Sequence, residues 1–453
     1  MKKTIITLLA VMLMALPAYA SVQNIKVSGD VESSYVYRTN FDFGLNLQHT
    51  DEYQSLFITH TRLRVDADLT DNVAATVALI NERVWTGSDT NASTDIDINL
   101  AYVTLREMLY SPLTIIIGRQ DFRYGNSLII DSAGPNNSAP ADSGINNVAE
   151  DMSKQSAFDA IRAVLDYNPL KVELAYVELD PGHTSLATTE DDKKLYGLNA
   201  TYEFGDDMNS VVEGYIWKQV DKTAQAGVGD DAQTILVKGI RGALNPIDAV
   251  SLQAEYAIQT GQKEVTSGVF RKRRAHVFQA ISTYQLPLLE EYKPMAMYVF
   301  TKATGDTSSS TDDGYYTAWD PLFENQAGGK IYNTIFSLSN FIQHEVSLSA
   351  VPIEDLTAQV SLTSLWLERE YDNDNEISLL SPDSSSTIGT MDTKADATHL
   401  GKEFDIKLTY DYTEDVQLGA NIGWFFPGSV FRISDSQNRN AAKQFILNCL
   451  VKF

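Results

Sequence analysis

The side chains best placed to do chemistry alternate along residues 57–69. Even-numbered positions there carry imidazole, guanidinium and carboxylate groups, at His60, Arg62, Arg64, Asp66 and Asp68. Odd-numbered positions are apolar or small. Strict alternation predicts a β-strand with one charged face and one apolar face. Soluble strands are usually about 5–6 residues long and membrane-spanning strands about 9–11, so we expect a barrel strand whose charged face meets water in a pore.

Other segments place charged side chains on faces opposite to, or at the ends of, apolar registers. The basic ones are Arg119, Arg162, Lys171, Arg241 and Lys407, and the acidic ones are Asp97, Glu173, Glu255 and Asp405. We therefore expect a lumen lined by charges of both signs. Two interpretations remain open. The charges pair across strands and stiffen the wall, or unpaired arginines form a path for anionic groups, because guanidinium binds carboxylates at any pH.

Motifs of known enzyme and metal sites are missing from the sequence. The six histidines form no zinc-binding pattern, and neither a Gly-x-Ser-x-Gly elbow nor a Gly-rich phosphate loop with its lysine occurs. We therefore expect no metal, no cofactor and no catalysis. A barrel enzyme whose Ser/His/acid set is assembled across strands remains an alternative, with His60 or His276 as its histidine.

Charge and cysteine content narrow the class further. The chain has 60 acidic and 35 basic residues and a formal net charge of −25, which argues against a nucleic-acid partner. Cys449 is the only cysteine, so an intrachain disulfide is excluded. Acidic clusters in the long breaks, such as residues 372–376, are expected to be solvated loop tips, with divalent-cation bridging as the alternative.

The first 20 residues have the pattern of a cleaved signal peptide. Lys2 and Lys3 precede an apolar core at residues 5–16, and the small-residue sequence Ala-Tyr-Ala ends at Ala20. No later segment is apolar for long enough to form a spanning helix. A membrane-embedded chain must then be a closed barrel, because only helices and barrels satisfy their backbone groups in lipid.

The remaining chain, residues 21–453, reads as one domain of about 18 alternating segments. They are 25–37, 57–69, 72–83, 95–107, 113–120, 158–167, 171–179, 193–204, 209–220, 233–243, 249–260, 273–285, 293–303, 341–352, 356–369, 400–412, 416–426 and 443–453. Short and long breaks alternate between them, as in all-β transmembrane antiparallel β-barrels with short periplasmic turns and long extracellular loops. The long break 126–156 is expected to fold inward and narrow the pore.

The C-terminal strand and the outer surface suggest partners. Phe453 ends the last alternating segment, and a terminal aromatic there is what outer-membrane barrels commonly present to their assembly machinery. The 22 Tyr, 18 Phe and 5 Trp suit aromatic girdles at the two membrane interfaces. We therefore expect outer-membrane lipid and lipopolysaccharide as surroundings, in the outer membrane of a Gram-negative bacterium.

Four motifs in order resemble the alginate-export outer-membrane porin family. They are GRQDFRYG at residues 118–125, Gly-Asp at 305–306 followed by DPLF at 320–323, HLGKEFD at 399–405, and FFPG at 425–428. The resemblance implies a monomeric barrel of 18 strands that passes an anionic polysaccharide or related solute. It also implies an arginine-rich constriction, with Arg119 and Arg123 as motif arginines.

The sequence therefore predicts a channel for passive export or diffusion of an anionic solute, oligosaccharide or polysaccharide. The candidate pore-lining residues are His60, Arg62, Arg64, Arg119, Arg123, Arg162, Arg241 and Lys407. A general or sugar-type porin without anion preference is the first alternative. A barrel enzyme and a structural or adhesive barrel with functional acidic loops are the others.

Overall fold

The computed structural model describes most of the chain that follows the predicted signal peptide. The described residues are 24–44, 53–85, 96–132, 149–155, 157–180, 193–222, 232–266, 269–306, 314–326, 329–370, 376–381, 384–392, 397–431 and 439–453. The predicted signal peptide, residues 1–20, lies outside them. Within them, no helix combines the length and apolar character needed to span a membrane.

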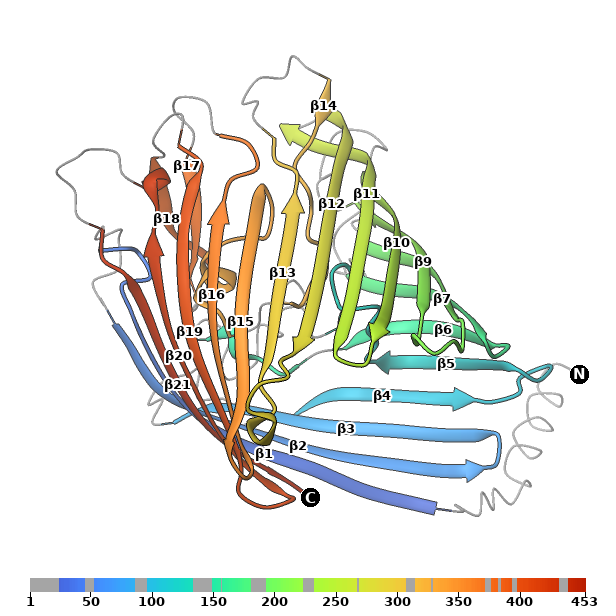
Figure 1. Cartoon of the computed structure of the whole chain (residues 1–453). Coiled ribbons are helices and arrows are strands. Elements are labelled where there is room, and N and C mark those ends of the chain that lie inside the picture. Colours follow the sequence, from blue (N-terminus) through green and yellow to red (C-terminus); the bar gives the residue numbers. More distant parts are fainter. Residues whose placement is uncertain are drawn as a thin grey trace, which may run out of the picture.

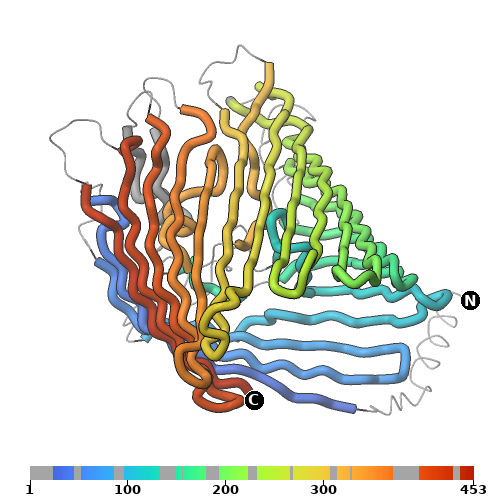
Figure 2. The backbone as a smooth tube through the Cα atoms, viewed as in Figure 1, coloured from blue at the N-terminus to red at the C-terminus, as the bar shows by residue number. Residues whose placement is uncertain are grey.

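One antiparallel sheet closes on itself to form the wall. Each strand pairs with its successor along the wall, and the last strand pairs back with the first. Figures 1 and 2 show the strands side by side, with tight turns at one end and long connections at the other. The wall strands are β1 (Asn24–Thr39), β2 (Tyr53–Thr70), β3 (Val73–Val84), β4 (Asp97–Leu105), β5 (Leu113–Gln120), β6 (Phe158–Asp166), β7 (Leu170–Asp180), β8 (Lys193–Glu203), β9 (Val211–Asp221), β10 (Gln233–Ile247), β11 (Val250–Thr266), β12 (Val269–Gln285), β13 (Met295–Ala303), β15 (Phe341–Ile353), β16 (Leu356–Trp366), β19 (His399–Asp411), β20 (Val416–Pro427) and β21 (Ala442–Lys452).

The predicted barrel of 18 strands is confirmed. The sheet contains 19 strands, but β14 (Tyr315–Tyr316) only adds two residues in parallel beside β12 and takes no place in the closed wall. All predicted segments match wall strands, with boundaries that differ by a few residues. The elements inside the long breaks were not predicted: β14, the hairpin of β17 (Glu376–Ser381) and β18 (Ser384–Asp392), and α2 (Ile331–Ile335).

The wall has an apolar outer face and a polar inner face, as the alternation predicts. On β2, Phe57 and Leu63 are 44% and 41% exposed, whereas the side chain of His60 between them is fully buried on the other face. Exposed aromatic residues gather near both ends of the strands, with Trp85 and Phe426 at one end and Phe204 and Tyr412 at the other. This distribution is that of a membrane-spanning barrel with two aromatic girdles.

Closure of the barrel depends on a close approach between its two terminal strands. The backbone of Phe453 accepts a hydrogen bond from the Gly29 amide at 2.8 Å and donates one to the Gly29 carbonyl at 3.0 Å. A β-carbon at position 29 would lie 2.5 Å from the Arg62 carbonyl oxygen and 2.7 Å from the Phe453 ring. Glycine is therefore required at this point of the seam.

The hydrophobic core lies inside the barrel, where two extracellular connections fold into the lumen. The first connection follows β5, and the second joins β13 to β15. They meet at a backbone bridge between Ile130 and Phe323, and the ring of Phe323 packs on Phe158 of the wall at 5.1 Å. The described part of the predicted inward loop, residues 126–132 and 149–155, therefore does fold inward; its residues 133–148 and Ser156 lie outside the described residues.

Candidate functional site

A cavity of about 360 Å³ lies between the two inward connections and the wall strands β12 to β20. Its lining combines side-chain amides with apolar residues and the aromatic residues Trp319, Tyr332 and Phe341. The amides come from both the loops and the wall: Asn126, Gln279, Asn325, Gln326, Gln343, Gln359 and Asn421. Several bond to one another, as between the Asn126 amide nitrogen and the Gln279 oxygen at 2.5 Å. The cavity is therefore a section of the lumen with both hydrogen-bonding and apolar walls.

Two cations face this cavity with their charged groups accessible to water. The side chain of Arg123 is 61% exposed and lies 3.7 Å from Asp131. Lys407 projects from the inner face of β19, is exposed, and pairs with no carboxylate among the residues that the structure describes. A third cation, Lys330, is engaged with Glu345 at 2.5 Å and is 18% exposed. Arg123 and Lys407 are therefore the charges that a solute in the cavity would meet.

The carboxylates of the cavity are withdrawn from water. Glu324, Glu345 and Asp405 line it, yet each residue is at most 6% exposed. Asp405 accepts a hydrogen bond from the Ser361 hydroxyl at 3.3 Å. Burial raises the pKa of the loop residue Glu324 to about 7, so its carboxyl group is partly neutral near physiological pH. The accessible charge of the cavity is consequently positive, although the chain as a whole is acidic.

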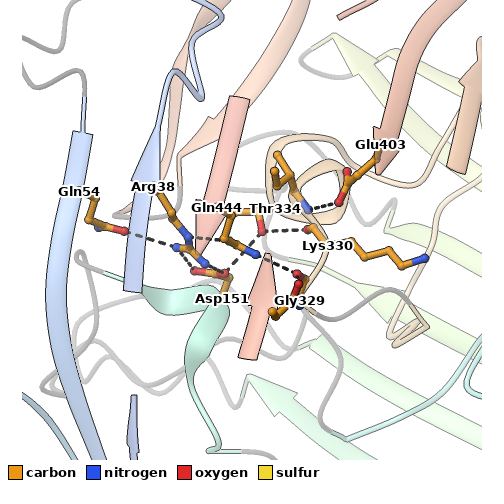
Figure 3. A network of polar contacts seen from close by, with 10 residues as sticks. Arg38, Gln54, Asp151, Gly329, Lys330, Thr334, Glu403 and Gln444 are labelled. Carbon is orange, nitrogen blue, oxygen red and sulfur yellow. Dashed lines mark hydrogen bonds and ion pairs between the residues drawn. The ribbon is translucent and has the colours of Figure 1, made fainter. Parts of the chain in front are cut away.

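A network of polar contacts fixes both inward connections to the wall (Figure 3). Arg38 on β1 forms a bidentate ion pair with Asp151 of the first connection, with nitrogen–oxygen distances of 2.5 and 3.0 Å, and its Nε donates to Gln444 at 2.8 Å. The Gln444 amide donates to the Gly329 carbonyl of the second connection at 2.8 Å. Arg38 is 2% exposed, so water does not compete strongly for these contacts.

Glu403 completes the anchoring of the second connection. Its two carboxylate oxygens accept hydrogen bonds from the backbone amides of Ile331 and Tyr332, at 2.7 and 2.8 Å. These amides open the short helix α2, whose first N–H groups have no partner within the helix. The helix is thereby fixed on the inner face of β19. These contacts hold the second connection, and with it one side of the cavity, in place.

Arg62 and Arg64 point into the lumen, but each is paired within the wall. Arg62 pairs with Asp30 of the neighbouring strand at 2.8 Å, and Arg64 pairs with Asp66 at 2.8 Å. The alternating register thus assigned their face correctly. Their partners satisfy the guanidinium groups in the way expected of charges that stiffen a wall.

His60 faces inward but does not line an open pore. Its side chain is fully buried, 3.5 Å from Glu82. Glu82 in turn accepts hydrogen bonds from the Ser153 hydroxyl at 2.8 Å and the Lys154 amide at 2.6 Å. The first inward connection therefore covers His60, which corrects the prediction that it lines the pore. Alternation along one strand gives the face of a residue and not what covers it.

Arg162 contacts the first inward connection, whereas Arg241 is engaged within the wall. The guanidinium of Arg162 lies over the Phe122 ring at 5.4 Å. Arg241 donates to Glu213 at 3.2 Å and to Gln253 at 2.8 Å. Both residues face inward, but Arg162 packs on the loop and Arg241 joins neighbouring wall strands.

Arg119 lies on the outer face, which corrects its assignment to the pore. Its neighbour across β4 and β5 is Ala101, and across β5 and β6 it faces Asp159, which is 61% exposed and lies 3.3 Å away. Ile117 and Ile161, on the same face, are 44% and 49% exposed. The motif continues past the end of β5 at Gln120, so two motif arginines four residues apart end on opposite sides of the wall.

A second chamber, of about 470 Å³, lies nearer the extracellular end and was not predicted. Its basic residues are Lys193, Lys263 and Arg273, and its acidic residues are Asp221 and Asp320. Arg273 is 4% exposed and lies 3.5 Å from Asp320. The sequence did contain a feature that could have predicted this chamber, namely the four consecutive basic residues at 271–274. Because side chains alternate along β12, Arg271 and Arg273 point inward. The loop residue Lys330 gave no comparable signal, because no periodic pattern surrounds it.

The structure offers no support for a metal centre in the part of the chain that it describes. No group of three or more histidine, cysteine, aspartate or glutamate side chains there could hold a metal ion. The predicted acidic loop positions 372–375 lie outside the described residues.

Several solved porin structures share this fold. Pseudomonas aeruginosa OpdK, solved with vanillate, has a TM-score of 0.57 and 11% identity over 95% of this chain and 99% of its own. OccAB3 of Acinetobacter baumannii has a TM-score of 0.56 and 11% identity over 95% of this chain and 100% of its own. P. aeruginosa OccK2 in complex with glucuronate has a TM-score of 0.54 and 10% identity over 95% and 99% of the two chains.

The sequence comparison reaches the same class by a separate route. No individual curated protein sequence matches this chain. The model of the alginate export family, however, matches residues 23–445, nearly the whole chain. The chain therefore belongs to the alginate export family, and it is an outer-membrane β-barrel channel for passive movement of a solute.

Proposed function

We propose that this channel prefers anionic solutes and that Arg123 and Lys407 are the cations that contact them. One observation carries the proposal: in the cavity these two cations are exposed, whereas the three carboxylates are buried. An accessible positive charge attracts anions even in a chain of negative net charge, because the local lining outweighs distant charge.

The ligands of two structural neighbours support a carboxylate as the anionic group. Vanillate, in the OpdK structure, and glucuronate, in the OccK2 structure, are both carboxylates. The neighbours share little sequence with this chain, so this support is by analogy of fold. An anionic oligosaccharide, as the family's description suggests, carries the same group on each unit.

A neutral sugar is the second candidate solute, and the amide lining favours it. Seven amide side chains and Trp319 surround the cavity, and such groups bind hydroxyls and sugar faces without using charge. In that case Arg123 and Lys407 would tune the current of small ions and would not select the solute.

Reversal potentials across a planar bilayer in a KCl gradient separate the two candidates. We expect anion selectivity for the wild type and its loss in the double variant Arg123→Gln, Lys407→Gln. The matched control is Arg274→Gln, which removes a cation from the outer face. Cation selectivity of the wild type, or equal selectivity of the double variant, would reject the anionic proposal.

We also infer the remaining partners and roles from the closed wall. One chain closes the barrel through β1 and β21, so the proposal needs only a monomer. Phe453 stays 62% exposed beside this seam, where the assembly machinery can reach it. The proposal assigns no catalytic role, because the family and the solved neighbours are channels.

A further inference from the structure

The outer face of the barrel carries a set of basic side chains that conduction does not use. We name it the basic belt, and its members are Arg83, Lys218, Lys238, Arg274, Lys402 and Lys443, all exposed. Residues directly opposite in a sheet share a face. Lys402 stands opposite Phe426, which is 51% exposed, and Lys218 stands opposite Tyr196, which is 43% exposed. The belt therefore points toward the membrane.

The belt is confined to one end of the barrel. Each member lies within about six residues of the extracellular end of its strand, from Arg83 near the end of β3 to Lys443 near the start of β21. In the periplasmic half of the described strands, no lysine or arginine faces outward. A general need for solubility would place such charges at both ends, so the asymmetry points to a partner on the extracellular side.

The belt also has few opposing charges. Three carboxylates share the outer face of the described strands: Asp159, Glu178 and Glu264. All three have partners of their own; Asp159 lies 3.3 Å from Arg119 and Glu178 lies 3.6 Å from Lys194. No member of the belt pairs with a carboxylate in the described chain. Its positive charge is therefore available to an external anion, on a protein whose net charge is −25.

A hollow in the outer wall gives the belt one defined subsite. It measures about 450 Å³ and is lined by Thr59, Asn81, Arg83 and Trp85. Trp85 stacks on Phe57 at 4.9 Å and donates its indole N–H to the Thr59 hydroxyl at 2.7 Å. The guanidinium of Arg83, next to an aromatic girdle, offers several hydrogen-bond donors to one tetrahedral anion.

We propose that the basic belt binds the phosphate groups of glycolipids in the outer leaflet of the membrane, with the Arg83 hollow as one phosphate subsite. Charged side chains are unfavourable in hydrocarbon and become tolerable at the interface. The long lysine stems let the ammonium groups reach that level. Anionic head groups attract basic residues near the membrane surface, whereas a zwitterionic leaflet would leave the belt without a counter-ion.

The test is a titration of the purified, folded protein in non-ionic detergent with diphosphoryl lipid A. We expect saturable binding, at least tenfold weaker for the dephosphorylated lipid. The variant Arg83→Gln, Lys402→Gln, Lys443→Gln should lose at least tenfold in affinity, since each cation near a charged lipid surface contributes about fivefold. Lys407→Gln, which removes a cation from the lumen, is the matched control and should bind as the wild type does.

Three results would overturn the proposal: equal affinity of the folded triple variant, equal binding of the dephosphorylated lipid, or complete displacement by millimolar inorganic phosphate, which would make the site one for free phosphate. Heat-modifiable migration in electrophoresis establishes that the variant is folded. If the triple variant does not fold, the proposal is tested with the wild-type protein alone. Raising the salt to about 0.5 M should then weaken binding of the phosphorylated lipid and leave the dephosphorylated lipid unaffected.

Discussion

Two regions of the lumen carry inward-facing cations, and they use them differently. In the wall of β1 to β3, Arg62 and Arg64 each lie 2.8 Å from an aspartate. In the cavity below the inward connections, Arg123 is 61% exposed, and Lys407 is exposed without a carboxylate partner in the described chain. Both regions present basic side chains to the lumen. The difference shows that availability of a charge depends on its neighbours across strands and from loops.

The largest expected effect comes from removing the anchor of the inward connections. In Arg38→Ala the first connection loses its ion pair with the wall; Asp151 keeps some contact with water, its side chain being 23% exposed, so we expect a cost of about 1.5–3 kcal/mol. We expect the first connection to detach, which would widen the lumen and raise the single-channel conductance. Bilayer recordings measure this, with Lys26→Ala, a cation near the periplasmic end of β1, as the control. An unchanged conductance would mean that the connections stay in place without Arg38.

An intermediate effect is expected from Glu324, whose pKa burial raises to about 7. As the pH rises through 7, the carboxyl ionises and adds negative charge to the cavity, so anion selectivity should fall between about pH 6 and 8. Between its ordinary pKa and about 7, the folded protein binds more protons here than the unfolded chain does, so stability also falls as the pH rises.

The variant Glu324→Gln tests this effect because it keeps the shape of the side chain and removes the titration. Its selectivity should not change over the same pH range. Reversal potentials at several pH values measure the selectivity, and urea unfolding measures the stability. A pH dependence that persists in the variant would assign the titration to another group.

The smallest effect is expected from the wall pairs. The double variant Arg62→Ala, Arg64→Ala should keep the selectivity of the wild type, because both guanidinium groups are already neutralised by aspartates. It should lose at most about 2 kcal/mol of stability, since each partly exposed pair contributes about 0–1 kcal/mol. A clear loss of anion selectivity would show that the paired arginines of the wall also select the solute, as the cations of the cavity are proposed to do.

The alternation of apolar and polar residues was sufficient to predict the barrel, because this pattern is a local property of each strand. A strand with one face in lipid and one in water must alternate, so every wall strand could be read from the residues themselves. The short elements α2 and β14 carry no such pattern, and contacts made after the chain folds back into the barrel stabilise them. The inward direction of the first loop followed from its length, but its contacts did not.

The sequence by itself determined the strand count, the polarity of the lumen and the face of residues in clearly alternating strands such as β2, because these follow from a period of two. Only the tertiary structure decided which inward charges are accessible. Asp30 neutralises Arg62, a loop covers His60, and Arg123 stays open to water. It also placed Arg119 outside. These outcomes depend on residues far apart in the chain, whose proximity is set by strand register and by loops that return into the barrel.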